Sequence, residues 1–286
     1  MTDTKRRRDR RSSQPPSMHL TTRDKAIVRA VYDYRLLKQT QIARLFFGGR
    51  SAAQRVLVRL YQHGYLERRF LSVHGGRSPT LYVLDKRGVE LLRTEFGLDK
   101  VHRYGAGDLK SDFLAHLLAI NDVRIAVTLA AARAGYELLR WNSDAEHKAD
   151  YDYVRIVSAG GRSQQVSLIP DGYFRLKTPY GYMSAFVEMD LGTMTLARFQ
   201  SKVRAYLGYH RSGAFERRYQ AQAMRVLTVT SSLKRLENLK GATEAAGGRQ
   251  PFAFAPLGEI TPETVLTQPV WWVASESGRV ALIQPR

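Results

Sequence analysis

Residues 39–66 read QTQIARLFFGGRSAAQRVLVRLYQHGYL, and this stretch predicts two short helices joined by a tight turn. The first helix is expected to end before Gly48 and Gly49, because two glycines give the backbone the freedom to change direction sharply. Ser51 is a suitable N-cap for the second helix. The apolar residues of that helix follow the i, i+3, i+4, i+7 rule and form its inner face: Ala53, Val56, Leu57 and Leu60.

The outer face of the second helix is polar and cationic. Arginine can hold a guanine edge through two hydrogen bonds, glutamine can do the same for adenine, and further cations can hold phosphates. We therefore predict that this helix reads base edges in the major groove of duplex DNA. The alternative is a solvated basic face on an ordinary helical domain. The predicted DNA-contacting residues of the helix are Arg50, Ser51, Gln54, Arg55, Arg59 and Gln62.

Two predicted strands follow the helix pair. They cover residues 65–70 (YLERRF) and 81–84 (LYVL), and a loop at residues 71–80 joins them. A helix-turn-helix followed by such a hairpin is typical of a winged helix, whose wing lies along the DNA backbone or enters the minor groove. Winged helices also serve as protein adaptors. The hairpin adds three predicted DNA-contacting residues: Arg68, Arg69 and Arg77.

The positive charge is concentrated at the front of the chain. Residues 1–100 hold 22 of the 45 Lys and Arg residues but 9 of the 26 Asp and Glu residues, so they contribute +13 of the net charge of +19. This asymmetry suits a polyanion, whose affinity would fall as salt rises. Residues 1–19 are rich in Arg, Ser and Pro and are predicted to be a disordered basic tail, either a solubility aid or an arm that grips phosphates.

Composition excludes several classes of protein. The chain has no cysteine, so it has neither disulfides nor thiolate metal sites. We find no run of about eighteen apolar residues and no apolar signal region behind the charged N-terminus. A cytoplasmic protein without a membrane partner is therefore expected. With 286 residues, 44% of them hydrophobic, the chain can bury a substantial core and has room for two domains.

The predicted fold class is α+β, with two domains. A winged-helix domain covers residues 20–97, a linker covers residues 98–111, and an α/β domain covers residues 112–286. The second domain is expected to open with a long helix at residues 112–134, which either pairs two copies of the chain in a homodimer or packs across a sheet. The strands predicted to form that sheet lie at residues 136–141, 166–169, 173–176, 184–189 and 224–230.

Three acidic residues of the second domain form a candidate metal site. Asp171 lies between two predicted strands, and Glu188 and Asp190 lie two residues apart on a later strand, so their side chains share one face. Together the three carboxylates are a reasonable oxygen-ligand set for Mg²⁺. A magnesium ion so held can polarise a phosphodiester and activate water. No other cofactor is expected.

The succession of strand, PD, strand, acid-x-residue, helix and strand is similar to the core of the PD-(D/E)xK nucleases, which implies a restriction-endonuclease-like second domain. That family has a lysine two residues after the second acid, where this chain has Asp190. The resemblance implies that Lys202, on the following helix, joins Asp171, Glu188 and Asp190 as a catalytic residue. Two outcomes stay open: a Mg²⁺-dependent nuclease, or a structural relic of that fold.

Taken together, both halves resemble the replication-relaxation family of bacterial plasmids and mobile elements. The resemblance implies DNA binding in plasmid replication, relaxation or transfer, with double-stranded DNA and other plasmid replication or transfer proteins as partners. Three functions remain in competition: a non-enzymatic DNA-binding protein, a Mg²⁺-dependent nickase or endonuclease, and a transcription regulator. The motifs that carry the resemblance are GYLERR (64–69), PDGYFRL (170–176), FVEMDLGT (186–193) and ARFQSKVRAYLGYH (197–210).

Overall fold

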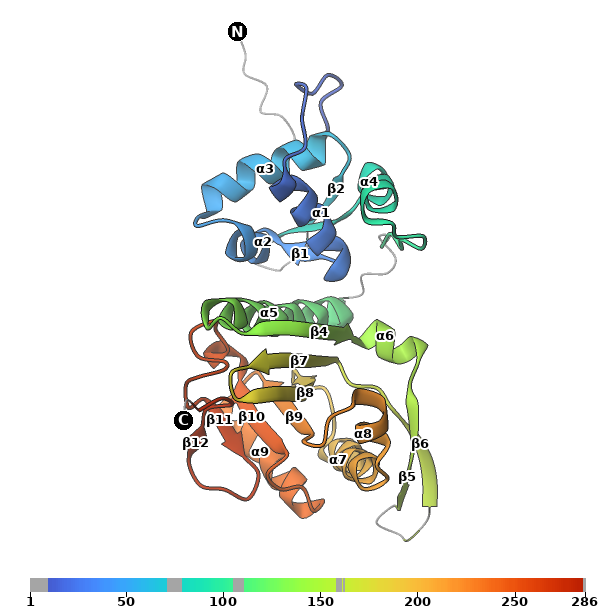
Figure 1. Ribbon diagram of the computed structural model, residues 1–286, viewed down its shortest axis with the longest axis vertical. Coiled ribbons are helices and arrows are strands. Elements are labelled where there is room, and N and C mark those ends of the chain that lie inside the picture. The colour runs from blue at the N-terminus through green and yellow to red at the C-terminus, as the bar shows by residue number, and fades with distance from the viewer. Residues whose placement is uncertain (1–9, 71–78, 105–110, 158–160, 162, 285–286) are drawn as a thin grey trace. The chain divides into compact units, whose positions relative to one another are not determined.

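The computed structural model describes residues 10–70, 79–104, 111–157, 161 and 163–284. The chain divides into two compact units, which we call unit 1 (Met1–Asn121) and unit 2 (Asp122–Arg286) (Figure 1). Both units combine helices with sheets, so the α+β class is confirmed. The division falls inside a helix, α5 (Ser111–Arg133), rather than in the predicted linker at residues 98–111.

Unit 1 begins with three helices: α1 (Thr22–Asp33), α2 (Gln39–Phe46) and α3 (Arg50–Gln62). Helix α1 starts at a capping box in which Thr21 and Asp24 satisfy each other's backbone N–H groups. Helices α2 and α3 are the pair predicted from the sequence. The predicted cap is wrong, because α3 begins two residues earlier with Gly49 in the N-cap position, and Gly49 offers no side chain to accept a hydrogen bond.

A three-stranded antiparallel sheet and a fourth helix complete the regular elements of unit 1: β1 (Leu37–Lys38), β2 (Leu66–Phe70), β3 (Thr80–Leu84) and α4 (Lys86–Phe96). The strand order is β1-β3-β2, with Leu66 opposite Leu84 and Phe70 opposite Thr80. The predicted hairpin is therefore present. Residues 71–78 of its loop, Arg77 among them, lie outside the described residues.

Residues 10–19 form no helix or strand, yet they contact the end of α3. Arg11 Nε donates to the carbonyl of Tyr61 at 2.7 Å, and its guanidinium also pairs with Asp85. The backbone N–H of Ser12 donates to Gln62 Oε1 at 2.6 Å. This part of the predicted disordered tail is therefore held against the fold by hydrogen bonds, while residues 1–9 lie outside the described residues.

Helix α5 contributes its first half to unit 1. Leu114, Leu117 and Leu118 pack against strand β3, and the amide nitrogen of Asn121 donates to the carbonyl of Leu36 at 2.8 Å. Contrary to the expectation from composition, Phe113–Arg133 is long and apolar enough to cross a membrane. The core helix of a water-soluble protein passes the same test, and 61% of the most apolar window is buried.

A seven-stranded mixed sheet forms the centre of unit 2, in the order β12-β11-β10-β9-β8-β7-β4 (Figure 1). Strands β8, β9 and β10 run parallel to one another, and the other neighbours pair antiparallel. The strands are β4 (Glu137–Ser143), β7 (Gly172–Thr178), β8 (Gly181–Asp190), β9 (Arg225–Thr230), β10 (Phe252–Pro256), β11 (Trp271–Val273) and β12 (Arg279–Val280). A separate hairpin consists of β5 (Asp152–Val157) and β6 (Ser163–Leu168).

The remaining helices of unit 2 are α6 (Asp144–Ala149), α7 (Leu196–Arg211), α8 (Ala214–Tyr219), α9 (Leu233–Ala245) and the 3-10 turn η2 (Leu257–Glu259). Helices α7 and α9 cover one face of the sheet, where Phe186 of β8 and Val226 of β9 join their core. Glu188 and Asp190 lie on the same face as Phe186, because side chains alternate along a strand. The fold therefore places both acids beneath α7 and α9.

Candidate functional site

Helix α3 separates its residues by chemistry. Ala53, Leu57 and Leu60 are fully buried in unit 1. The residues that alternate with them on the opposite side are polar and face solvent, as the helical period requires. Four predicted DNA-contacting residues are exposed at the start of the helix: Arg50, Ser51, Gln54 and Arg55.

These four side chains make no hydrogen bond or ion pair with another side chain among the described residues. Arg50 and Arg55 keep their full complement of guanidinium donors, and Gln54 keeps both amide donors and its carbonyl acceptor. The first turns of α3 therefore present two cations and one amide whose hydrogen-bonding groups are available to a ligand.

Later on the same helix, the predicted contacts are already in use. Arg59 Nη2 lies 3.5 Å from both carboxylate oxygens of Asp24, although half of the Arg59 side chain stays exposed. Gln62 accepts the hydrogen bond from Ser12. The structure thus divides the predicted reading face into a free N-terminal part and a C-terminal part engaged by the rest of unit 1.

Arg68 and Arg69, two of the cations predicted on the hairpin, contact other side chains of unit 1. The Arg68 guanidinium lies 4.1 Å from the centre of the Tyr61 ring, in a cation–π contact. Arg69 Nη2 lies 3.0 Å from Glu67 Oε1. These arginines carry positive charge near β2, but their hydrogen-bonding groups are less accessible than those of α3.

A cationic hollow of about 620 Å³ lies where β2 meets the start of α4. The sequence analysis missed it, because its residues come from four separate segments and no local pattern connects them. Two carboxylates, Glu67 and Asp85, offset part of its charge. The cations that line it are Arg10, Arg11, Arg68, Lys86, Arg87 and Arg103.

The acidic cluster of unit 2 is centred on Glu188, which is 4% exposed. Its carboxylate accepts hydrogen bonds from Lys202 Nζ and from the Tyr206 hydroxyl, both on α7. These two residues lie one helical turn apart and so face the same strand. Burial raises the pKa of Glu188 to about 7, and the positive charge of Lys202 opposes that rise. Among the predicted residues, Lys202 therefore contacts Glu188.

Asp171 belongs to the same cluster. Its Oδ2 accepts the backbone N–H of Met189 at 2.9 Å, which ties the PD turn to strand β8. The negative charge of Asp171 is close enough to raise the pKa of both Glu188 and Lys202. Asp171, Glu188 and Lys202 therefore interact electrostatically.

Asp190 differs, because Arg235 of α9 neutralises it. Arg235 Nε and Nη2 donate to the two Asp190 oxygens at 2.8 and 2.9 Å, and the N–H of Gly192 donates to Oδ1 at 2.8 Å. Such a fork-to-carboxylate pair uses both oxygens of the acid. Arg235 was missed in the sequence, since it lies 45 residues from its partner.

These contacts argue against the predicted magnesium site. In the part of the chain that the structure describes, no group of three or more His, Cys, Asp or Glu side chains is placed to hold a metal ion. The three predicted ligands do not converge on one point. Each of the two buried acids is instead paired with a cation, Glu188 with Lys202 and Asp190 with Arg235. The arrangement therefore does not fit Mg²⁺.

Two buried hydroxyls lie beside the acids. Thr228 and Thr230 of β9 are opposite Glu188 and Asp190 in the parallel pairing, and both are fully buried. Neither hydroxyl has a hydrogen-bond partner among the described residues. A buried hydroxyl without a partner is unfavourable for folding. We call the buried polar residues beneath α7 and α9 the polar strip: Glu188, Asp190, Thr228 and Thr230.

Lys202 also lines a pocket of about 540 Å³ between α7 and the β5–β6 hairpin. Arg198 of α7 and Gln165 of β6 are among its polar lining residues. This pocket gives solvent access to the lysine side of the cluster.

Comparisons with known proteins bear on both units. Residues 28–245 match the family model described as "Replication-relaxation". No curated protein matches the chain. Among solved structures, the one titled "Structure of restriction endonuclease FokI" matches with 12% identity and a TM-score of 0.31, over 83% of this chain and 43% of that one. The chain thus spans less than half of that protein, and a likeness at this score supports no argument.

Proposed function

The chain belongs to the replication-relaxation family, and we propose that it is a plasmid or mobile-element protein that binds duplex DNA through a winged helix in unit 1. Binding would serve replication, relaxation or transfer, or the regulation of these processes. In this proposal unit 2 is a nuclease-like domain without catalytic activity, which contacts a second copy of the chain or other plasmid proteins.

The observation that carries the proposal is the free face at the start of α3. In helix-turn-helix proteins, the N-terminal residues of the second helix contact base edges. Arg50, Gln54 and Arg55 occupy those positions, are exposed, and have no partner among the described residues. Arginine and glutamine are also the residues best suited to bidentate contacts with guanine and adenine.

The surroundings of α3 favour the same ligand. The hairpin of β2 and β3 follows α3 directly, in the order expected of a wing. The cationic hollow beside β2 adds positive charge on unit 1, which suits contacts with phosphates. A polyanion therefore has both a reading helix and positive charge near it.

The proposal is tested by fluorescence anisotropy with a labelled duplex and the full chain. We expect Arg55→Ala to weaken binding by about 5- to 150-fold, because a good arginine contact to a base contributes roughly 1–3 kcal/mol. Arg93→Ala is the matched control, since Arg93 is also exposed in unit 1 but lies on α4. We expect the control to bind like the parent.

Gln54→Ala separates reading from simple charge attraction, because it removes no charge. It should change the sequence preference, measured by selection from a duplex library, more than the overall affinity. If Arg55→Ala and Gln54→Ala both match the parent in affinity and preference at moderate salt, α3 is not the reading helix.

One observation favours a second function, a DNA nickase. Lys202 contacts Glu188, and Asp171 lies near both, which is the grouping implied by the PD-(D/E)xK resemblance. Against it stand the neutralised Asp190 and the lack of fit to Mg²⁺. Incubation of supercoiled plasmid with the protein and Mg²⁺ or Mn²⁺ distinguishes the two. Nicking by the parent but not by Asp171→Ala would establish the nickase and overturn the non-catalytic assignment.

A further inference from the structure

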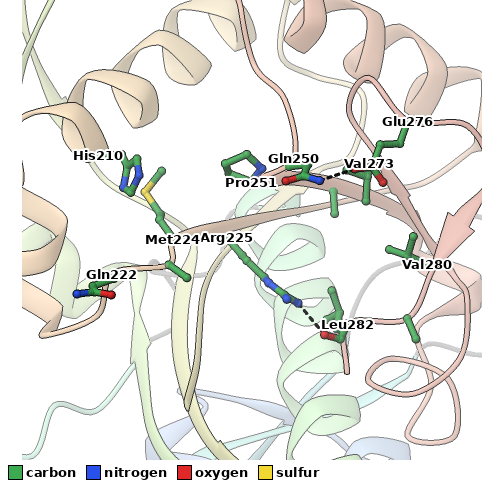
Figure 2. Close-up of a pocket in the computed structure, with 13 residues that line it drawn as sticks. His210, Gln222, Met224, Arg225, Gln250, Pro251, Val273, Glu276, Val280 and Leu282 are labelled. Carbon is green, nitrogen blue, oxygen red and sulfur yellow. Dashed lines mark hydrogen bonds between the residues drawn. The ribbon is translucent and has the colours of Figure 1, made fainter. Parts of the chain in front are cut away.

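A second cavity of unit 2 lies at the other end of the sheet from the acidic cluster. It is about 420 Å³ in volume and opens where β9 and β10 begin (Figure 2). Arg225, the first residue of β9, pairs with Ala185, whereas Asp190 pairs with Thr230. Five residues of strand, or about 16 Å, separate the two rows. This cavity is therefore distinct from the acidic cluster.

Arg225 extends along the cavity wall with its guanidinium group directed at Leu282 (Figure 2). Nη1 donates to the Leu282 carbonyl at 2.7 Å and lies 3.6 Å from the sulfur of Met183. Nε and Nη2 have no acceptor among the described residues. Burial lowers the pKa of Arg225. No carboxylate of the described residues forms an ion pair with it.

Among the described residues, the lack of an ion pair distinguishes Arg225 from the buried acids of the same unit. Glu188 is paired with Lys202, and Asp190 with Arg235. Arg225 is half-buried, and a charge partly removed from water without a partner is unfavourable for folding, so proteins normally pair it. Within the described residues, Arg225 instead directs unused donors at a cavity.

We propose that this cavity binds a small molecule with a single acid group, whose carboxylate or phosphate oxygens accept hydrogen bonds from Nε and Nη2 of Arg225. The planar guanidinium fork matches two oxygens of one acid group. The volume lies within the range of small-molecule sites. Apolar side chains would contact the body of the ligand: Met224, Val273, Val280 and Leu282.

The charge of the rim limits the ligand. Glu276 lines the cavity, where its carboxylate accepts a hydrogen bond from Gln250 at 2.9 Å (Figure 2). This negative charge would repel a polyanion, so the site suits one acid group and not a DNA backbone. The proposal is accordingly independent of DNA binding by unit 1.

The test uses thermal unfolding of the full chain, followed by tryptophan fluorescence. All three tryptophans, Trp141, Trp271 and Trp272, lie in unit 2, so the signal reports this unit alone. The probes are benzoate, inorganic phosphate and, as an uncharged analogue, benzamide, all at equal ionic strength. We expect benzoate or phosphate to raise the midpoint by roughly 3–5 °C at about ten times the Kd, and benzamide to have no such effect.

Variants assign the effect to Arg225. In Arg225→Gln the shift should disappear, while Arg140→Gln, an exposed arginine of β4, should keep it. If Arg225→Gln does not fold, Val280→Phe fills the cavity with the charge intact and should also abolish the shift.

A shift with benzoate alone identifies a carboxylate as the ligand group, and a shift with phosphate alone identifies a phosphate. The proposal is overturned if neither anion shifts the midpoint of the parent. Equal shifts with benzamide, or an undiminished shift in Arg225→Gln or Val280→Phe, overturn it as well.

Discussion

The outward face of α3 and the polar strip beneath α7 and α9 differ in the exposure and pairing of their charged side chains. At the start of α3, Arg50 and Arg55 are exposed and have no ionic partner among the described residues. In unit 2, Glu188 and Asp190 are 4% exposed, and each has a cation against it. Water solvates an exposed arginine at little cost, whereas a buried carboxylate requires a partner.

This difference distinguishes charged side chains that are available to a ligand from charged side chains that stabilise the fold. The cations of α3 contribute little to stability and remain available to phosphates and base edges. Lys202 and Arg235 are committed to the acids of unit 2, so a metal ion would have to displace them. The comparison therefore predicts that variants of α3 change binding and variants of the strip change stability.

The largest expected effect comes from breaking the Asp190–Arg235 pair. Asp190→Ala leaves Arg235, which is 17% exposed, without its carboxylate. We expect the free energy of unfolding of unit 2 to fall by about 3 kcal/mol, at the low end for a broken buried pair because Arg235 also donates to the Met194 carbonyl. Urea unfolding followed by tryptophan fluorescence measures it.

The control for that variant is Asp150→Ala. Asp150 also pairs with an arginine, Arg218, but its side chain is 84% exposed. Exposed pairs contribute little, so this change should be near neutral. Equal losses in the two variants would contradict the distinction between buried and exposed charge.

The next largest effect is expected in the pH dependence of the free energy of unfolding of unit 2. Burial, with a smaller contribution from Arg218, lowers the pKa of His147 to about 4. The unfolded chain, with a histidine pKa near 6.5, then binds more protons than the folded chain between these values. The stability contributed by neutral His147 is fully present above about pH 6.5 and is lost as the pH falls towards 4.

Comparison with His147→Leu isolates this contribution, because the opposite pH dependence expected from the raised pKa of Glu188 cancels in the difference. Between about pH 7 and pH 4, the parent should lose roughly 2–3 kcal/mol relative to the variant. The measurement is urea unfolding at each pH. Parallel curves would show that His147 is not held neutral.

Local sequence patterns predicted the elements that depend on neighbours in the chain. The helix pair at residues 39–62 follows from apolar periodicity, and the strands at residues 66–70 and 80–84 follow from composition. The PD turn and the strand ending at Asp190 were likewise recognisable, because their order along the chain is itself the signal.

Long-range partners were not predictable in this way. Arg235 meets Asp190 across 45 residues, and Arg11 meets Tyr61 across 50. Which cation reaches which acid depends on how α9 lies on the sheet, and no spacing in the sequence encodes that. For this reason the sequence predicted three converging acids where the structure has two acids paired with cations. It also missed Arg225, which has no ion pair within the described part of the chain.

A smaller effect on stability is expected at the buried hydroxyls that lack a hydrogen-bond partner. Thr228→Val replaces a buried hydroxyl without a partner by a methyl group of similar size, so it should raise the free energy of unfolding by about 1 kcal/mol. Thr243→Val is the matched control, since Thr243 is equally buried but donates to the Leu239 carbonyl at 2.8 Å. The control should lower stability by about the same amount. A loss of stability in Thr228→Val would mean that its hydroxyl is satisfied.

The smallest expected effect concerns the two parts of α3. The affinity for duplex DNA is measured for Arg59→Ala beside Arg55→Ala. Arg59 lies 3.5 Å from the carboxylate of Asp24, which offsets part of its charge before DNA arrives, whereas Arg55 has no such neighbour among the described residues. We expect Arg59→Ala to weaken binding by less than about threefold. Its slope of log affinity against log salt should change by less than the roughly 0.9 of one full phosphate contact. If Arg59→Ala weakened binding as much as Arg55→Ala, Arg59 would have to leave Asp24 on binding, and the free face of α3 would extend one turn further than its unbound contacts indicate.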